Sequence, residues 1–280
     1  IYNPKGQLYT PVDRDQVMYY KEDKAGQILQ EGINEAGGMA SWIAAATSYS
    51  TNNRIMIPFY VYYSMFGFQR IGDLAWAAGD MQARGFLLGG TSGRTTLNGE
   101  GLQHEDGHSH ILANTIPNCV SYDPTFAHEV AVIMHDGLKR MVERQENVFY
   151  YITLLNENYA MPGLLPGTEE QIIKGMYLCK PGADGDKRVQ LLGSGTILRE
   201  SLEAQTLLAA DWGVQADVWS CPSFNELTRE GQDADRWNLL HPLETPRVPF
   251  VTRQLGSRSG PVVASTDYMK AYAEQIRPFV

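Results

Sequence analysis

The sequence has few cysteines and no long apolar run. Its three cysteines, Cys119, Cys179 and Cys221, are odd in number and widely spaced. They therefore provide neither a disulfide framework nor the Cys-x-x-Cys pairs of a zinc knuckle, and a reducing, cytoplasmic location is favoured. No apolar stretch approaches the roughly 20 residues that a membrane-spanning helix requires, so we expect no membrane partner.

Basic residues are also few. The chain contains 23 Lys and Arg against 32 Asp and Glu, a net charge of −9, and the basic residues form no cluster. Nucleic acids and anionic membranes are bound by basic patches, so we expect neither as a partner. Residues 1–6 contain neither an initiator methionine nor the basic start of a signal peptide. We therefore expect an internal piece of a longer polypeptide.

Short apolar runs alternate with segments of helical periodicity. Strands are expected at residues 55–62, 86–90, 118–122 and 148–155, and helices at 32–50, 66–84 and 126–144. This alternation predicts an α/β fold in which crossover helices join the strands of a parallel sheet.

The composition changes after residue 158. Pro-Gly pairs at 162–163, 166–167 and 181–182 indicate a connection between domains. We expect a first domain at 1–160, a linker at 161–187 and a second domain at 188–280. The second domain opens with a strand at 189–193, a helix at 197–212 and a strand at 216–220. Its Gly193-Ser194-Gly195 turn lacks the third glycine of a dinucleotide-binding fingerprint.

Residues 99–110 are the most informative segment. Glycines interrupt three histidines and three carboxylates: His104, His108, His110, Glu100, Glu105 and Asp106. The segment is too polar for a core and too rich in glycine for a helix. Because imidazoles titrate near neutral pH, we predict a functional loop.

Several uses of this loop are compatible with the residues alone. A metal-dependent hydrolase or lyase would use His104, His108 and His110, although Gly107 interrupts the helical spacing of paired ligands. The histidines could instead form only local hydrogen bonds, or the chain could be a silent piece that contributes a dimer surface. General acid–base catalysis by imidazole and carboxylate is modestly favoured.

Two upstream segments supply further polar and aromatic side chains. Glu35 lies between a short expected strand and a glycine-rich helix start, where its carboxylate would point into a cleft at the edge of the sheet. The commoner use of such a glutamate is to stabilise the helix N-terminus. Residues 62–68 contain four aromatics at a junction between strand and helix, where rings can line a pocket.

Together these segments resemble the thiamine-diphosphate enzymes of the transketolase type. The run 32–39 is similar to the stretch that carries the family's cofactor glutamate, and Met65-Phe66 to the aromatic motif beside the cofactor's pyrimidine. Residues 104–110 are similar to its Gly-Glu-Asp-Gly-x-x-His segment. The runs 47–53, 92–101 and 241–247 resemble more closely the homodimeric bacterial family of pyruvate-decarboxylating first components of the pyruvate dehydrogenase complex. This resemblance covers essentially the whole chain.

The resemblance implies a fold and an activity. The fold is a transketolase-like pyrimidine-binding domain followed by part of a smaller α/β C-terminal domain, both with parallel sheets. The activity is oxidative decarboxylation of pyruvate with thiamine diphosphate and transfer of the acetyl unit to lipoamide. The partners are a second copy of the enzyme and the lipoyl-bearing dihydrolipoamide acetyltransferase. Transfer of two-carbon units between sugars, as in transketolase, is the alternative within this class.

The resemblance also implies roles for individual residues. Glu35 would hydrogen-bond the aminopyrimidine, Phe66 would stack on it, and Ile33 would lie beside the cofactor on the strand that approaches Glu35. Tyr63, His104 and Glu100 would line the substrate pocket, with His104 orienting pyruvate or giving a proton to the lipoyl sulfur. His110 and Asp106 would also reach the site.

The ligands of the cofactor's diphosphate and of Mg2+ are expected on a domain absent from this chain. The only superficial match, Gly182-Ala183-Asp184-Gly185, lies in the expected linker, with no strand before it and no helix after it to receive a phosphate. By the resemblance, we also expect the C-terminal domain to be incomplete. We therefore expect the isolated chain to bind the cofactor weakly and to be inactive.

Overall fold

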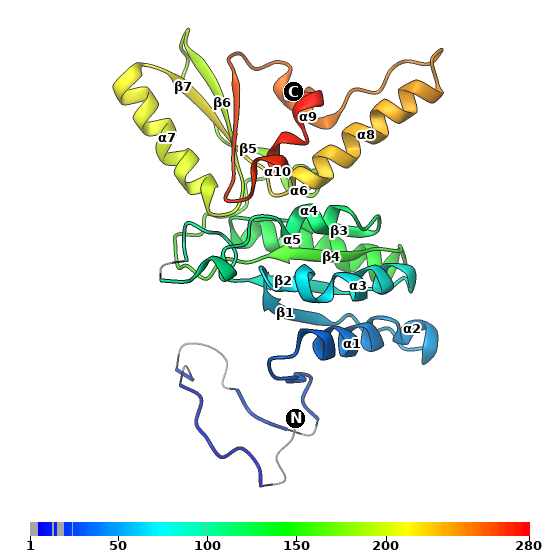
Figure 1. Cartoon of the computed structure of the whole chain (residues 1–280). Helices are drawn as coiled ribbons and strands as arrows, with labels where there is room; N and C mark the ends of the chain where they lie inside the picture. Colours follow the sequence, from blue (N-terminus) through cyan, green and yellow to red (C-terminus); the bar gives the residue numbers. More distant parts are fainter. Residues whose placement is uncertain (1–4, 13, 16–19, 24, 98) are drawn as a thin grey trace.

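A parallel sheet forms the centre of the first half of the protein. The computed structural model describes residues 5–12, 14–15, 20–23, 25–97 and 99–280. The sheet has the strand order β1-β2-β4-β3, with β1 at Phe59–Tyr63, β2 at Phe86–Gly90, β3 at Cys119–Tyr122 and β4 at Phe149–Thr153. We call this sheet and its helices the first unit (Figure 1).

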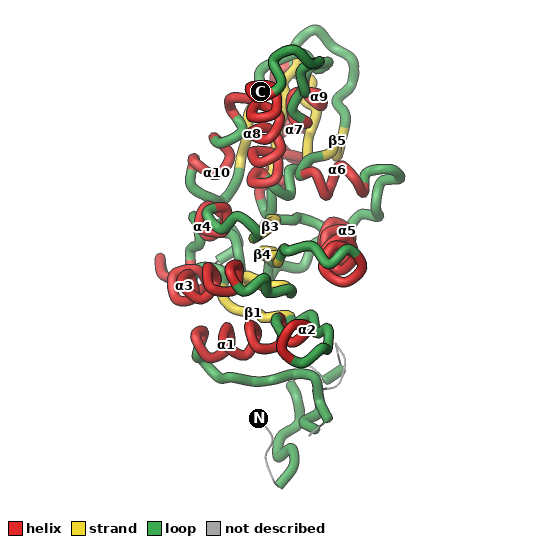
Figure 2. The backbone as a smooth tube through the Cα atoms, turned by 90° about the vertical axis from the view of Figure 1, so that its right-hand side faces the viewer, coloured by secondary structure: helices red, strands yellow, loops and turns green. Residues whose placement is uncertain are grey.

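Helices cover both faces of this sheet, which explains the continuous apolar character of its central strands. One face packs against α1 (Glu35–Ala46), α3 (Gly67–Asp80) and α4 (Ser109–Asn114), and the other against α5 (Ala127–Leu138). Figure 2 shows these helices on opposite sides of the strands. The short α2 (Ser48–Thr51) follows α1, and α5 continues into a π-helical turn at Lys139–Glu143. Leu87 faces the first group and Phe86 the second, as alternation along a strand requires.

The edge strand β1 is covered less completely. Tyr60 and Tyr62 pack toward α1 and α3. On the opposite face Phe59, Val61 and Tyr63 are 51%, 64% and 51% exposed. The β1 edge therefore carries an apolar strip of three side chains that this chain does not bury.

A second sheet forms the centre of the second unit. Its order is β5-β7-β6-β8, with β5 at Tyr177–Lys180, β6 at Arg188–Gly193, β7 at Gln215–Ser220 and β8 at Val262–Ser265. α7 (Ile197–Trp212) packs on one face. α8 (Phe224–Leu240), α9 (Phe250–Leu255), α10 (Lys270–Glu274) and a final turn at Arg277–Phe279 cover the other. Figure 1 shows this unit above the first.

Three expectations differ from the structure. β5 runs antiparallel to β7, so the second sheet is mixed rather than parallel. The expected linker, 161–187, contains α6 (Glu169–Lys174) and β5. β5 is a strand because it pairs with β7, and composition does not reveal such pairing with a distant segment. No strand occurs in residues 25–34. Asn34 instead caps α1, its side chain accepting a hydrogen bond from Gly37 N.

Buried polar contacts join the two units. The Glu129 carboxylate of α5 accepts hydrogen bonds from Tyr177 Oη at 2.8 Å and Ser220 Oγ at 2.6 Å, both in the second unit. Arg229 of α8 donates to the carbonyls of Cys119, Ile116 and Asn114 in the first unit. Such contacts require matched donors and acceptors, so they fix one relative placement of the units. Among the described residues, no helix is both long and apolar enough to cross a bilayer.

Two glycines of α3 give opposite predictions for substitution by alanine. A Cβ at Gly67 would collide with the buried ring of Tyr62, whereas one at Gly72 would meet no atom within 4 Å. We expect Gly67→Ala to destabilise the protein by about 2 kcal/mol through overpacking. Gly72→Ala should stabilise it by about 0.5–1 kcal/mol, because alanine loses less backbone entropy in a helix. Urea denaturation of both variants measures the difference, and equal midpoints would contradict the packing argument.

Candidate active site

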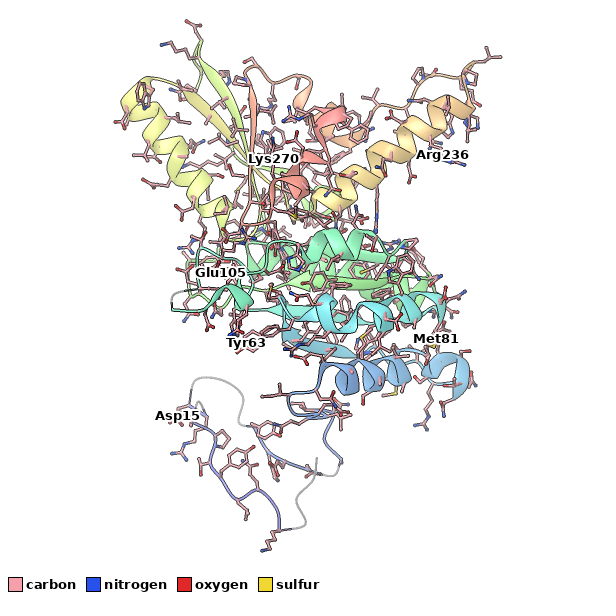
Figure 3. The ribbon with its side chains drawn as sticks, viewed as in Figure 1. Asp15, Tyr63, Met81, Glu105, Arg236 and Lys270 are labelled. Atoms are coloured by element: carbon pink, nitrogen blue, oxygen red, sulfur yellow. The ribbon has the colours of Figure 1, made fainter. Side chains whose placement is uncertain are left out.

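Four of the predicted site residues, Tyr63, Phe66, Glu100 and His104, lie together at the carboxyl edge of the first sheet. β1 ends at Tyr63, and β2 ends at Gly90, from which residues 91–108 run to α4. We call residues 91–108 the site loop; Asn98 lies outside the described residues. Ligands of open α/β sheets bind outside the carboxyl ends of the strands. Figure 3 shows Tyr63 and Glu105, which belongs to the loop, at the same end of the sheet.

Three rings form an aromatic cluster at this edge. The ring of His104 lies 5.5 Å from Tyr63 and 5.1 Å from Phe66, centroid to centroid, and Tyr63 lies 5.9 Å from Phe66. All three pairs meet edge to face, the arrangement that aromatic quadrupoles favour. A short 3-10 helix, Leu102–His104, carries the imidazole to the cluster. The structure thus brings together three residues that the sequence places 41 positions apart at most.

The imidazole of His104 has two differently placed nitrogens. Nε2 lies 3.5 Å from Oε2 of Glu100, one turn earlier in the site loop. Nδ1 is buried and has no hydrogen-bond partner among the described residues. The Glu100 side chain is 43% exposed, whereas that of His104 is 21% exposed. The imidazole is therefore oriented by a carboxylate and retains an unused polar atom beside the aromatic rings.

Glu35 joins the cluster through Arg70. Nη1 of Arg70 donates to Oε1 of Glu35 at 2.6 Å, and the guanidinium lies 4.5 Å from the centre of the Phe66 ring. Glu35 is the first residue of α1, so its carboxylate also lies at the positive end of that helix, as the commoner use of such a residue predicts. Nearby, burial and the carboxylates of Glu35 and Glu31 raise the pKa of Tyr60 to about 12.

Arg70 was not among the site residues predicted from the sequence. Its spacing of four residues from Phe66 on α3 is a signal that a cation could lie over the ring. Its ion pair with Glu35, 35 residues away, depends on the packing of α1 against α3 and has no local signature.

Ile33 does not take part in this arrangement. Its side chain is 99% exposed, and the residues before Glu35 form no strand that would carry it toward the cluster. The placement on a strand was therefore wrong, because the Asn34 cap starts the helix at once.

Asp106 and His110 lie apart from the aromatic cluster and are fully buried. The Asp106 carboxylate accepts from the backbone of His108 and Ser109 and from Ser109 Oγ, which starts α4. His110 Nε2 lies 2.9 Å from Thr153 Oγ1. Its ring packs against Tyr151, Tyr268 and Tyr272. The expectation of a segment too polar for a core was therefore wrong for Asp106, Ser109 and His110. Hydrogen bonds satisfy Asp106 and Ser109, whereas Nδ1 of the buried His110 has no partner among the described residues.

Asp123 lies beside His110 at the junction of the two units. Its carboxylate accepts from Thr153 Oγ1 at 2.7 Å and, across the junction, from Ser194 Oγ at 2.8 Å. Burial raises the pKa of Asp123 to about 7, although both hydroxyl donors act in the opposite direction. Burial lowers the pKa of His110 to about 4, against the opposing charge of Asp106. Thr153 thus bridges two buried groups with opposite pKa shifts.

The arrangement is suited to one part of thiamine diphosphate. Glu35 and Phe66 offer a carboxylate and an apolar ring face for a pyrimidine, and His104 Nδ1 is a buried polar atom without a protein partner. The diphosphate and Mg2+ find no equivalent. In the described ranges, no group of three or more His, Cys, Asp or Glu could hold a metal ion. The three loop histidines also separate, since His104 joins the aromatic cluster and His110 the junction, so a metal site built from them is not supported.

Comparison with known proteins agrees with this architecture. A family model described as "Pyruvate dehydrogenase E1 component middle domain" matches residues 1–162, and "Transketolase-like TK C-terminal domain" matches residues 175–279. A transketolase structure from Campylobacter jejuni aligns with a TM-score of 0.57 at 16% identity, over 85% of this chain and 32% of that one. At this identity the similarity shows the fold alone.

The fold is thus that of a transketolase-like α/β protein. Because the middle-domain model matches more than half of the sequence, the chain belongs to the pyruvate dehydrogenase E1 component family. Proteins named pyruvate dehydrogenase E1 component from Escherichia coli (strain K12) and Pseudomonas aeruginosa are 68% and 66% identical to it over 281 residues. These alignments cover 100% of this chain and 32% of each relative, so the chain spans about a third of their length.

The two buried groups at the junction predict opposite dependences of stability on pH. Folding raises the pKa of Asp123 from 3.8, so its contribution is complete below about pH 4 and is lost as the pH rises to about 7. Folding lowers the pKa of His110 from 6.5, so its contribution is complete above about pH 6.5 and is lost as the pH falls to about 4. Relative to wild type, Asp123→Asn should gain stability as the pH rises from 4 to 7.

His110→Gln should show the opposite trend and lose stability relative to wild type as the pH rises from 4 to 6.5. Chemical denaturation at a series of pH values measures both slopes. Curves for the two variants that run parallel to wild type across this range would contradict the assigned pKa shifts.

Proposed function

We propose that the chain forms the pyrimidine side of a thiamine-diphosphate site in a pyruvate dehydrogenase E1 component. The full-length enzyme would decarboxylate pyruvate oxidatively and pass the acetyl unit to lipoamide of the dihydrolipoamide acetyltransferase. The observation that carries this proposal is the contact series Glu35–Arg70–Phe66 and Tyr63–His104–Glu100 at one edge of the sheet. The names of the relatives support it.

Glu35 and Phe66 would hold the aminopyrimidine. Bound thiamine diphosphate supplies the electron sink that decarboxylation of a 2-oxo acid needs. The Glu35 carboxylate would share a proton with a ring nitrogen, and Arg70 would keep it aimed while it does so. The Phe66 ring would support one face of the heterocycle, and Tyr63 would exclude water from the same side.

His104 would act on the substrate. Its imidazole would hydrogen-bond a carboxylate or carbonyl oxygen of pyruvate or a lipoyl sulfur, while Glu100 orients the ring from the Nε2 side. A side chain placed this way can hold and deliver one proton at a fixed atom. We propose that the principal demand for this proton comes when the acetyl unit passes to lipoamide.

The rest of the site would come from other parts of the longer enzyme. Ligands of the diphosphate and of Mg2+ would lie on a domain outside this sequence. A second copy of the enzyme would cover the apolar strip Phe59, Val61 and Tyr63, which runs directly into the aromatic cluster. Exposed apolar strips beside a polar rim are typical of interfaces. Transfer between sugars has no comparable support, because similarity to transketolases shows the fold alone.

Glu35→Gln in the full-length enzyme should lower pyruvate decarboxylation by roughly 100-fold or more, because the amide cannot exchange a proton with the pyrimidine. Decarboxylation is followed with an artificial electron acceptor, and cofactor binding by calorimetry. Asp73→Asn on the exposed face of α3 removes the same charge nearby and should behave as wild type. Wild-type turnover by the Glu35 variant would refute the assignment.

His104→Ala should reduce acetyl transfer to lipoamide about 10-fold more than it reduces decarboxylation, since the lost proton serves the transfer step. The two rates are measured separately, with an artificial acceptor and with the lipoyl domain. His108→Ala is the matched control, because His108 lies at the start of α4 outside the aromatic cluster. Equal loss of both rates would contradict this division of roles.

A further inference from the structure

The site loop has little structure of its own to hold Glu100 and His104. Among the described residues between Gly90 and Ser109, the only regular element is the turn Leu102–His104. The start of the loop is held by the first unit, because the backbone N–H and the hydroxyl of Ser92 both donate to Leu154 O. The guanidinium of Arg94 lies where a Cβ of Gly107 would be, so the two limbs of the loop meet at its base. Residues 95–97 and 99–106 extend beyond this base.

Two residues of the second unit, Asp267 and Met269, each contact one limb of the loop. Asp267 accepts from Thr95 N at 3.1 Å and from Thr95 Oγ1 at 2.6 Å. Met269 N donates to Gly107 O at 2.9 Å. We call residues 267–269 the clasp. Figure 3 shows Glu105 of the loop below Lys270, the residue that follows the clasp.

The buried residue of the clasp anchors it to the junction. The ring of Tyr268 lies 5.0 Å from His110 and 5.1 Å from Tyr272, and is buried. The clasp therefore cannot shift without disturbing the packed interface between the units. Gly93 permits the close approach: it has a φ of +86°, and a Cβ there would lie 3.0 Å from Asp267 Oδ2.

We propose that Asp267 is a positioning residue, which sets the site loop by holding Thr95 and thereby places His104 and Glu100 against the aromatic cluster. This inference rests on the proposed function for its effect on activity. Fixing both limbs of a loop reduces the number of conformations that the residues between them can adopt. Because catalysis depends on the position of the reacting group, a freer His104 acts more slowly.

Asp267 differs from the structural contacts of the junction. The carboxylate is partly exposed, whereas Glu129 and Asp123 are buried and join the units independently. Its removal should therefore loosen the loop and leave global stability nearly unchanged. A role in domain joining alone would produce the reverse pattern.

The test uses the full-length enzyme with cofactor and compares Asp267→Asn, Thr95→Val and the double variant. Asparagine places an amide group where a carboxylate oxygen accepts from Thr95, and valine removes the hydroxyl while keeping the shape. Asp235→Asn, an exposed acid on α8, is the control. Hydrogen exchange of amides 99–106 is measured with the melting temperature, and kcat and KM are measured for decarboxylation and for acetyl transfer.

We expect loop amides to exchange roughly 10-fold faster in Asp267→Asn and Thr95→Val, with no further increase in the double variant. The kcat of acetyl transfer should fall about 10-fold while KM for pyruvate changes little. Thr95→Ser keeps the hydroxyl donor and should restore both exchange and kcat. The melting temperature and the control should match wild type.

Unchanged exchange in both single variants would overturn the proposal, whatever their activity. Faster exchange with an unchanged kcat would also overturn it, because the loop would then not need the clasp to place His104. If Asp267→Asn fails to fold, Thr95→Val alone still decides between these outcomes. An inactive wild-type enzyme would refute the proposed function instead, while the exchange data would still test the clasp.

Discussion

The buried hydrogen bonds between the two units are the constraint on which the rest of the structure depends. The Glu129 carboxylate accepts from the backbone amides of Thr125 and Phe126. It also accepts from the hydroxyls of Tyr177 and Ser220, and all four hydrogen bonds are buried. A buried carboxylate costs more free energy than it returns if any of its donors is lost. The units therefore have one acceptable placement, and a small rotation of the second unit would leave acceptors unsatisfied. The clasp and the start of α4 are therefore also held in one position.

The segment 99–110 is divided by this constraint. Residues 106–110 are drawn into the junction, where Asp106 caps α4 and His110 packs among three tyrosines. Residues 100–104 stay outside it and turn toward Tyr63 and Phe66. One histidine-rich segment therefore supplies both an anchor and a reactive side chain. Because residues 106–110 are anchored in the junction, the segment 99–110 can hold the imidazole of His104 in a defined position despite its three glycines.

Local sequence predicted those elements whose stability is local. β2 was expected at 86–90 and α7 at 197–212, the bounds that the structure has, because a bounded apolar run and a long amphipathic period are each nearly sufficient signals. β5 and the Glu35–Arg70 pair could not be predicted this way, since each depends on a partner distant in sequence. For Tyr63, Phe66, His104 and Glu100, resemblance supplied the candidates and the structure supplied their contacts. Ile33 also came from the resemblance; it is 99% exposed in this chain, and its place beside the cofactor stays a prediction.

Electrostatics explains why the cluster alone is an incomplete site. The chain has a net charge of −9, and Arg70, which lies over the Phe66 ring of the cluster, is already paired with Glu35. On the proposed function, a diphosphate brought to this edge would meet the carboxylates of Glu35 and Glu100, and that repulsion would disfavour its binding here. The same carboxylates are well suited to the opposite, uncharged end of the cofactor, where a ring nitrogen can share a proton. On the proposed function, this division of charge would orient the cofactor with its pyrimidine toward this chain and its phosphates toward a surface that supplies positive charge.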